Sequence, residues 1–330
     1  MYSRERRTGE PSGADLASRS RRAPDVAALT SIVIVNFNGG ALLARCVEAA
    51  LFSSTPVEVL IVDNASSDGS LQALKERCHG DPRVRILENA ENVGFARATN
   101  RALRQAAGDY VLVLNPDCVV PADTIGRMRA VMDSHPEAAM AGCLLLNPDG
   151  TEQAGARRSV PTPWRALVRA LNLARWFPNH PRLFSDYVLV REPLPADPTA
   201  VEAISGAFMF VRPADMDRVG LLDEGYFLHC EDLDWCMRFR QQGRQILFVP
   251  DVTVVHYKGH CSRGRPIRVL WHMHRGMVRF YRKFFRHQYP EPLMWLVVAG
   301  VWLRFSALAV RAAVRRDEPV PEERESRHPG

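Results

Sequence analysis

Short apolar segments alternate with helical segments along the first half of the chain, and this alternation constrains the fold more than any other feature. Apolar, β-branched runs predict strands at 31–35, 57–62, 84–87, 110–114 and 139–146, and the segments between them predict helices at 41–50, 70–77, 95–107 and 123–134. Parallel strands are usually joined by crossover helices. The pattern therefore predicts an α/β fold with a mostly parallel central sheet and helices on both faces.

The second half of the chain is less regular. Residues 147–200 contain eight prolines, which predicts loops and one short helix near 164–177. Further on, the pattern predicts strands at 207–211, 245–249 and 252–256 and helices at 213–219, 231–242, 266–287 and 292–315. Residues 1–29 and 317–330 lack apolar periodicity, and we expect a disordered leader and a disordered tail.

Composition excludes several classes of protein. The chain has 330 residues, of which 46% are hydrophobic, so it can bury a core and is neither collagen-like nor wholly disordered. It contains no run of eighteen apolar residues and no apolar segment near its start, which argues against a membrane span and a secretory signal. Its seven cysteines form no C-x-x-C pair, which favours reduced thiols and a cytoplasmic setting.

Positive charge is concentrated late in the sequence. Residues 261–316 hold twelve Lys and Arg and one acidic residue, whereas residues 31–260 hold 23 basic and 27 acidic residues. The basic segment also contains three tryptophans and the apolar run Leu293–Leu303, a combination suited to an anionic membrane surface. The alternative is a pair of amphipathic helices that complete the core and leave their arginines in water. No nucleic-acid-binding motif is present, so we expect no nucleic-acid partner.

Polar residues follow the ends of three predicted strands, at Asn36, Asp63 and Asn115 to Asp117. Ligands of open α/β sheets bind outside the carboxyl ends of the strands. Asp63 can accept hydrogen bonds from a nucleobase or a ribose hydroxyl, or it can belong to a turn before the next helix. Asp117 can bind a divalent cation that also holds a diphosphate, or the Asn-Pro-Asp sequence can be a type I turn only.

Two further segments carry groups suited to chemistry. Asn92, Gly94 and Arg97 open a predicted helix, where a glycine lets the backbone approach a phosphate and an arginine can pair with it. No G-x-G-x-x-G motif is present, so a nicotinamide-type site is not supported. The second segment places three acids at the start of a helix: Glu231, Asp232 and Asp234. Helix capping explains one or two of them, and crowding of like charges can raise one pKa and make a better base.

Seven segments, in the same order and spacing, resemble the family 2 glycosyltransferases. They are SIVIVNFNG (31–39), VEVLIVDNASSDGS (57–70), ENVGFARATN (91–100), YVLVLNPD (110–117), SGAFMFVR (205–212), GYFLHCEDLDWCMRFRQQG (225–243) and VTVVHYKGHCS (252–262). The resemblance implies a GT-A fold, a nucleotide-diphospho-sugar transferase sandwich, followed by C-terminal amphipathic helices. The bacterial rhamnosyltransferase-like enzymes are the subgroup that the chain resembles most.

The resemblance also implies roles for individual residues. It assigns donor nucleotide-sugar binding to Asn36, Asp63, Asn92, Gly94, Arg97 and Asp117, and a divalent Mn²⁺ or Mg²⁺ to Asp117 and His256. Asp232 matches the catalytic base, and Glu231 and Asp234 would orient it or the acceptor. Many family members have Asp where this chain has Asn115, so one negative ligand of the D-x-D metal motif is missing here.

These implications give a specific expectation of function. We expect an inverting glycosyltransferase that moves a sugar, such as rhamnose, to a glycan or polyprenyl-diphosphate-linked acceptor in bacterial cell-surface polysaccharide synthesis. The expected organisation is a GT-A domain over 30–262, with a nucleotide-sugar half (30–146) and an acceptor half (147–262), and then a basic membrane-associating extension (263–316). The expected location is the cytoplasmic face of the cell membrane. Two alternatives are a catalytically silent scaffold with the same fold and a nucleotidyltransferase.

Overall fold

The computed structural model describes residues 28–170, 173–176, 180, 187–259 and 266–315. The predicted disordered leader and tail therefore lie almost wholly outside the described residues. The strands are β1 (Thr30–Asn36), β2 (Val57–Asp63), β3 (Val84–Glu88), β4 (Tyr110–Leu114), β5 (Cys118–Val119), β6 (Ala138–Leu146), β7 (Arg157–Arg158), β8 (Thr199–Ala200), β9 (Ala203–Ile204), β10 (Phe208–Val211) and β11 (Gln245–His256).

Helices join most of these strands, as the sequence predicted. They are α1 (Gly40–Leu51), α2 (Ser70–Arg77), α3 (Phe95–Leu103), α4 (Thr124–Ser134), α5 (Pro163–Ala170), α6 (Leu173–Trp176), the 3₁₀ turn η2 (Leu189–Arg191), α8 (Pro213–Val219), α9 (Glu231–Gln241), α10 (Pro266–Phe285) and α11 (Glu291–Arg315). The helix expected near 164–177 is present as two short pieces, α5 and α6.

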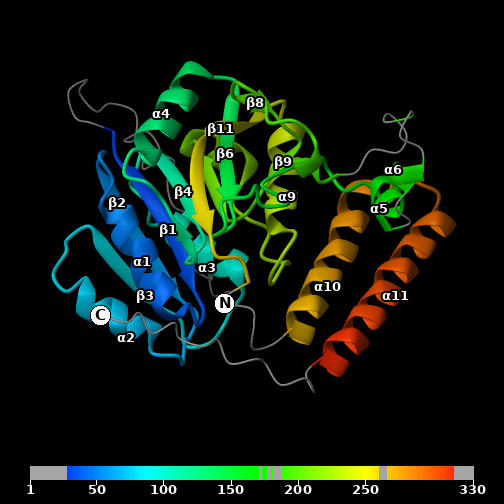
Figure 1. The fold of residues 1–330 in the computed structure, drawn as a ribbon, viewed down its shortest axis with the longest axis horizontal. Helices are drawn as coiled ribbons and strands as arrows, with labels where there is room; N and C mark the ends of the chain where they lie inside the picture. Colours follow the sequence, from blue (N-terminus) through cyan, green and yellow to red (C-terminus); the bar gives the residue numbers. More distant parts are fainter. Residues whose placement is uncertain (1–27, 171–172, 177–179, 181–186, 260–265, 316–330) are drawn as a thin grey trace, which may run out of the picture.

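A single large sheet with the strand order β3-β2-β1-β4-β10-β6-β11-β5 forms the centre of the fold (Figure 1). Strands β1 to β4 are mutually parallel, and β6 and β11 run in the same direction. Strand β10 lies between β4 and β6 and is antiparallel to both. The mostly parallel α/β sheet expected from the sequence is therefore confirmed, with one reversed strand in its middle.

The two strands expected at 245–249 and 252–256 are one continuous strand, β11. Pro250 and Asp251 favour a break in the chain, but the strand instead shifts register against β6 between Val249 and Thr253. A bulge of this kind accommodates a proline, which cannot donate to the ladder. The bulge carries the end of β11 on to His256 without leaving the sheet.

Both faces of the sheet are buried, which explains the continuous apolar runs in the sequence. Successive residues of β1 point to opposite sides, so Ile32 and Ile34 belong to one core cluster and Val33 and Val35 to the other. Helices α1, α2 and α4 contribute to the first cluster, and α3, α8, α9 and α10 to the second. Phe280, Phe284 and other residues of α10 thus complete the core of the sheet domain.

Helix α11 packs along α10 at one end of the molecule and leaves most of its apolar surface exposed (Figure 1). Leu296, Leu303 and Val310 are 70%, 73% and 64% exposed and recur every seven residues, on one outward face. In the sequence, Arg304 interrupts the apolar run Leu293–Leu303, which argues against a membrane-spanning helix. Nevertheless, Glu291–Val314 is the one described helix long and apolar enough to cross a membrane, and 11% of its most apolar stretch is buried.

Helix α10 is attached to the sheet domain by a cluster of ion pairs. Lys283 contacts Asp223 at 2.7 Å and the fully buried Asp234 at 2.6 Å, and Arg279 contacts Asp223 at 2.9 Å. Burial opposes the ionisation of Asp223, but Lys283, the Gly225 N–H and Arg279 together lower its pKa to about 2. The cluster therefore joins two basic and two acidic side chains from α9, α10 and the loop before α9.

Replacing Lys283 tests this attachment. We expect Lys283→Met to lower the free energy of unfolding by about 2 kcal/mol or more, because it leaves one oxygen of the buried Asp234 without its cation. Arg282→Met, at the neighbouring exposed position, should change it by less than about 0.5 kcal/mol. Denaturant titration followed by circular dichroism measures both. Equal stability of the two variants would contradict the ion-pair account.

Candidate active site

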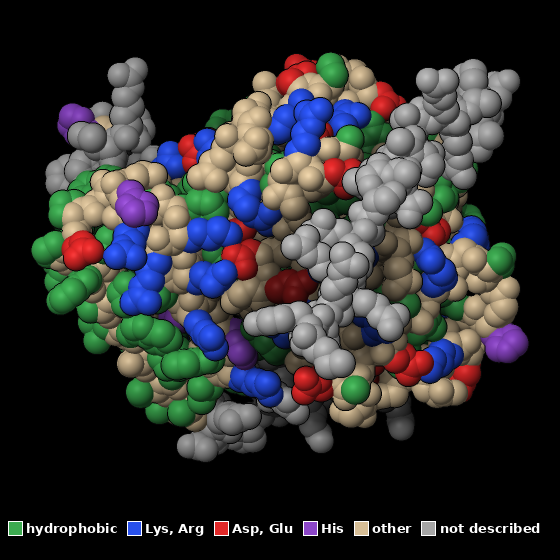
Figure 2. Space-filling model, turned by 180° about the vertical axis from the view of Figure 1, so that it is seen from behind, with side chains coloured by type: hydrophobic (Ala, Val, Ile, Leu, Met, Phe, Trp, Pro, Cys, Tyr) green, Lys and Arg blue, Asp and Glu red, His purple; other side chains and the backbone are tan. Residues whose placement is uncertain are grey.

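The carboxyl ends of six strands lie along one edge of the sheet. Strands β1, β2, β3, β4, β6 and β11 all end there, and the antiparallel β10 begins there. This edge is where open α/β sheets bind ligands. Figure 2 shows a hollow in the molecular surface, with an acidic side chain on its floor and Lys and Arg side chains beside it.

Asn36 and Asp63 are cross-strand partners at this edge, and both are buried. The Asn36 side-chain amide donates to Asp63 Oδ1 at 2.7 Å and to Ser66 Oγ at 2.9 Å. Asp63 Oδ2 accepts from the Ser66 N–H, so the turn expected as the alternative is present. Asp68, five residues on, accepts from the backbone and hydroxyl of Ser70 at the start of α2. These hydrogen bonds fix the conformation of the loop that follows β2. They do not prevent a ligand from binding next to Asp63.

The 92–97 segment packs against the loop that precedes α9. Gly94 has φ of +89°, and a Cβ there would lie 2.6 Å from the Phe227 carbonyl oxygen, so only glycine fits. Asn92 accepts from the Gly94 N–H at 3.0 Å, and the Phe95 N–H donates to the same Phe227 oxygen at 2.7 Å. Arg97 is exposed and lies 3.6 Å from Glu224. The backbone of this segment is therefore fixed, whereas the Arg97 side chain lies in solvent.

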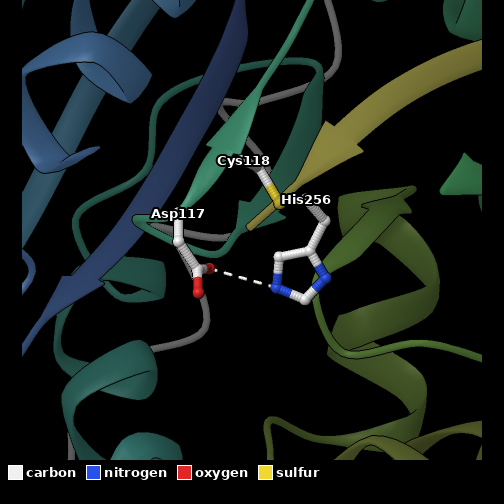
Figure 3. A group of neighbouring side chains, drawn as sticks. All are labelled: Asp117, Cys118 and His256. Atoms are coloured by element: carbon white, nitrogen blue, oxygen red, sulfur yellow. Dashed lines mark ion pairs between the residues drawn. The ribbon is translucent and has the colours of Figure 1, made fainter. Parts of the chain in front are cut away.

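Asp117 and His256 lie together, as the sequence comparison implied (Figure 3). His256 Nε2 is 3.1 Å from Asp117 Oδ1, and both side chains are 6% exposed. Asp117 Oδ1 has no hydrogen-bond partner among the described residues. A buried carboxylate oxygen and an imidazole nitrogen facing one another, both able to accept, fit a divalent cation.

Cys118 is the third potential ligand of this group, because its sulfur lies within 4.8 Å of the ligand atoms of the other two residues. It pairs with His256 across β5 and β11, and its thiol donates to the Ala207 carbonyl. Complete burial raises the pKa of the thiol well above its usual value. Burial therefore disfavours the thiolate, which makes Cys118 a weaker candidate ligand than the carboxylate and the imidazole beside it. Cys78, Cys143, Cys230 and Cys236 also carry free thiols.

Asp232 lies at the same edge, held by three donors. Its Oδ2 accepts from Arg158 Nη2 at 2.5 Å and from the Gly206 N–H at 3.0 Å, and its Oδ1 accepts from the Leu233 N–H at 2.8 Å. Burial opposes its ionisation, but Arg158 and these N–H groups lower its pKa overall. Asp232 is therefore an ionised carboxylate, with a side chain that is 14% exposed.

A short path of backbone contacts links Asp232 to the turn that carries Asp117. Gly206, which donates to Asp232, is followed by Ala207, and the Ala207 carbonyl accepts from the Asn115 N–H at 3.0 Å. Asn115 begins the turn that carries Asp117, and its amide lies 3.5 Å from His256 Nε2. These contacts fix the Asp232 side of the site relative to the Asp117 side.

The other two acids of α9 lie in different surroundings. Glu231 is buried, and its pKa is raised to about 8 by burial and by the neighbouring charge of Asp232. Asp234 is fully buried and ion-paired with Arg238 at 2.7 Å and with Lys283. Asp234 therefore faces the junction with α10, not the hollow edge, and its contacts are those of a structural residue.

Within the described residues, the four non-glycine residues with a left-handed backbone all lie in loops at this edge. They are Asn38 (φ 56°), Ala65 (φ 59°), His229 (φ 69°) and Cys230 (φ 71°). Such conformations cost about 1–3 kcal/mol each and tend to gather at functional sites. Gly276 of α10 supports the last pair, because a Cβ there would lie 2.8 Å from the His229 oxygen.

Sequence reasoning missed two residues of the site, Arg158 and Gln153. Arg158 holds Asp232, and Gln153 Oε1 lies 2.6 Å from His256 Nδ1. Both lie in the proline-rich segment, where neither a motif nor apolar periodicity singles out a residue. Only the buried ionised Asp232 and the buried His256 could have prompted a search for such partners, because buried polar groups need them.

The sequence has recognisable relatives. Residues 31–194 match the profile of glycosyl transferase family 2. The chain is 31% identical over 297 residues, 86% of its length and 94% of the relative, to an N-acetylglucosaminyl-diphospho-decaprenol L-rhamnosyltransferase of Mycobacterium tuberculosis. It is 25% identical over 251 residues, 73% of its length and 89% of the relative, to rhamnosyltransferase WbbL of Escherichia coli.

Among solved structures, the fold is similar to that of a mannosyltransferase from Pyrobaculum calidifontis in complex with GDP-Man and Mn²⁺. The TM-score is 0.54 at 20% identity, covering 93% of this chain and 82% of the other. This likeness identifies the GT-A fold and thereby confirms the expected fold class. Because the family profile matches residues 31–194 and the mycobacterial relative is 31% identical over 86% of the chain, the chain belongs to glycosyl transferase family 2 and is a glycosyltransferase.

Proposed function

We propose that this enzyme transfers a rhamnosyl unit from a nucleotide-diphosphate donor to a hydroxyl of a polyprenyl-diphosphate-linked N-acetylglucosamine, in the synthesis of a bacterial cell-surface polysaccharide. The mycobacterial relative, which is an N-acetylglucosaminyl-diphospho-decaprenol L-rhamnosyltransferase, supports the choice of sugar and acceptor. The observation that carries the proposal is the contact path from Asp232 through Gly206 and Ala207 to the turn bearing Asp117. It supports the proposal because the carboxylates of Asp232 and Asp117, which we assign to the base and to the diphosphate end of the donor, lie on the same edge of the sheet.

The donor occupies the edge formed by β1, β2 and α3. Asp63 and Asn36 contact the base or ribose, and the backbone around Asn92 and Gly94 lies along the diphosphate. The N-terminal end of α3 favours that negative charge. Arg97 is exposed, and its ion-pair partner among the described residues is the partly exposed Glu224, so it can turn to the diphosphate at little cost.

Asp117 and His256 hold a divalent cation, Mn²⁺ or Mg²⁺. The unpartnered Asp117 Oδ1 and the facing His256 Nε2 provide an oxygen and a nitrogen ligand without rearrangement. When bound, the cation neutralises the charge that develops on the leaving diphosphate. Asn115 carries no negative charge, so Asp117 would be the one carboxylate that this turn offers to the cation.

Asp232 is the catalytic base. Arg158 and the Gly206 N–H keep it ionised, so at neutral pH it can accept the proton of the attacking acceptor hydroxyl. Glu231 is less suited to this role because it is more deeply buried and holds its own proton. Attack on the side of the anomeric carbon opposite the diphosphate gives one displacement and an inverted configuration.

The C-terminal helices hold the enzyme on the cytoplasmic face of the membrane, where a lipid-linked acceptor is found. The outward face of α11 is apolar along its length, and Arg304 and Arg311 on the same helix are exposed. An exposed apolar face with flanking arginines suits anionic lipid. Figure 2 shows hydrophobic side chains gathered over this end of the molecule.

A donor screen tests the proposed reaction. With a lipid-diphosphate-linked N-acetylglucosamine acceptor, Mn²⁺ and dTDP-, UDP- or GDP-sugars, we expect transfer from a rhamnose donor with inversion at the anomeric carbon. Asp232→Asn should then lower kcat by about 10²- to 10⁴-fold, the usual contribution of a general base. Product is measured by mass spectrometry of the lipid fraction.

The control is Glu76→Gln, an exposed change on α2 that should leave kcat unaltered. Calorimetric titration with the donor nucleotide checks that Asp232→Asn still assembles the donor site. A variant that binds the nucleotide normally and keeps kcat within tenfold of the wild type would exclude Asp232 as the base. Failure of every donor would favour the silent-scaffold alternative.

Membrane association can be tested by sedimentation with vesicles. We expect binding to anionic vesicles that weakens as salt rises, because the Debye length shortens. Leu296→Glu combined with Leu303→Glu should lower the partition coefficient by about 100-fold or more, since each buried leucine contributes about 1.5–3 kcal/mol. Phe52→Glu, a change at a 79% exposed residue of the sheet domain, is the matched control. Equal binding by all three proteins would exclude α11 as the membrane contact.

A further inference from the structure

The His256 ring contacts a buried side chain, that of Gln153, which is not among the site residues expected from the sequence. Gln153 is 4% exposed, and its Oε1 lies 2.6 Å from His256 Nδ1, on the side of the ring opposite Asp117. The same amide reaches the backbone of the same residue, with Nε2 3.2 Å from the His256 carbonyl oxygen. Gln153 thus contacts both the ring and the main chain of the residue at the end of β11.

The orientation of the Gln153 amide follows from its partners. The His256 carbonyl can only accept, so the group that faces it must be the NH₂. That NH₂ also donates to Asn147 Oδ1 at 3.0 Å. The remaining Gln153 oxygen can only accept, and therefore His256 Nδ1 carries the hydrogen between them.

The hydrogen bonds beyond Asn147 enforce the same polarity. Asn147 Nδ2 donates to Thr151 Oγ1 at 3.0 Å, and the Thr151 hydroxyl donates to Asp149 Oδ1 at 2.6 Å. The Thr151 hydroxyl and N–H lower the pKa of Asp149, which is therefore an ionised carboxylate that only accepts. The chain runs from Asp149 through Thr151, Asn147 and Gln153 to His256 with every donor and acceptor matched.

We propose that Gln153 is a positioning residue for the cation site: it holds the His256 ring with Nδ1–H directed away from Asp117, and so leaves Nε2 as the ligand nitrogen. The proposal rests on the cation site proposed above and extends it to a residue outside the ligand set. Partners of this kind orient ligating histidines, and their loss typically weakens metal binding by 10- to 100-fold. Gln153 reaches the site because the turn after β6 returns the chain beside the end of β11.

The test is a titration of the metal-free protein with Mn²⁺ alone, followed by the electron paramagnetic resonance signal of free Mn²⁺. We expect Gln153→Met to raise the Mn²⁺ Kd by 10- to 100-fold. In a His256→Ala background the same change should alter the Kd by less than about twofold, because Gln153 acts through His256. Gln72→Met, an exposed change on α2, is the matched control and should bind as the wild type does.

Each outcome decides the question. Wild-type affinity in Gln153→Met, with weak binding by His256→Ala, overturns this inference and leaves the cation site standing. Equal affinity of the wild type and His256→Ala removes the cation site and this inference with it. An equal loss from Gln153→Met in both backgrounds shows a merely structural role and also overturns it. If Gln153→Met does not fold, Gln153→Glu replaces it, because Glu keeps the accepting oxygen. Its Mn²⁺ Kd should stay within about tenfold of the wild-type value. A loss of Mn²⁺ affinity as large as that of His256→Ala would contradict the proposal.

Discussion

The reversed direction of β10 is the constraint on which the site depends. Strand β10 lies between β4 and β6 and is antiparallel to both, so its first residues lie where β4 ends. This brings Gly206 and Ala207 beside Asn115 and presents the Gly206 N–H to Asp232. With a parallel strand in that place, the residues before it would lie at the opposite edge of the sheet, far from Asp117. The fold thereby joins the edge formed by β1, β2 and β4 to helix α9, which carries Asp232.

Helix α10 links this edge to the rest of the molecule. Its apolar face completes the core on one side of the sheet, and its ion pairs with Asp223 and Asp234 fix it to the loop before α9. Near its start, His272 stacks on Phe227 at 4.1 Å, and Phe227 in turn is packed against Gly94. The C-terminal segment therefore has two parts. Helix α10 packs against the sheet and the loop before α9, and helix α11 leaves an apolar face exposed at the molecular surface. Completing the core, one of the two alternatives for this segment, is the role of α10, and the proposed membrane contact belongs to α11.

The sequence predicted the longer strands, most helices and the residues at the strand ends because each depends on local pattern, whereas the two-residue strands β5, β7, β8 and β9 were not predicted. Apolar runs flanked by polar residues identified β1, β2 and β4, and these strands placed Asn36, Asp63 and Asp117 at one edge. The direction of β10 could not be predicted, because a buried strand of four residues has the same composition in either orientation. Arg158 and Gln153 were missed for a related reason. Their roles come from partners 74 and 103 residues away, with no periodic signal nearby. Asp234 was grouped with Glu231 and Asp232 by sequence proximity, yet the turn of the helix directs it to α10.

The central claim is that one sheet edge holds the cation and the donor diphosphate together, with His256 as a ligand. Electron spin echo spectroscopy of Mn²⁺ bound to the enzyme with a nucleoside diphosphate tests it most directly. The account predicts ¹⁴N modulation from one imidazole and ³¹P coupling from the nucleotide in the same sample, with the nitrogen signal lost in His256→Ala. A spectrum with phosphorus coupling and no nitrogen modulation in the wild type would contradict the account.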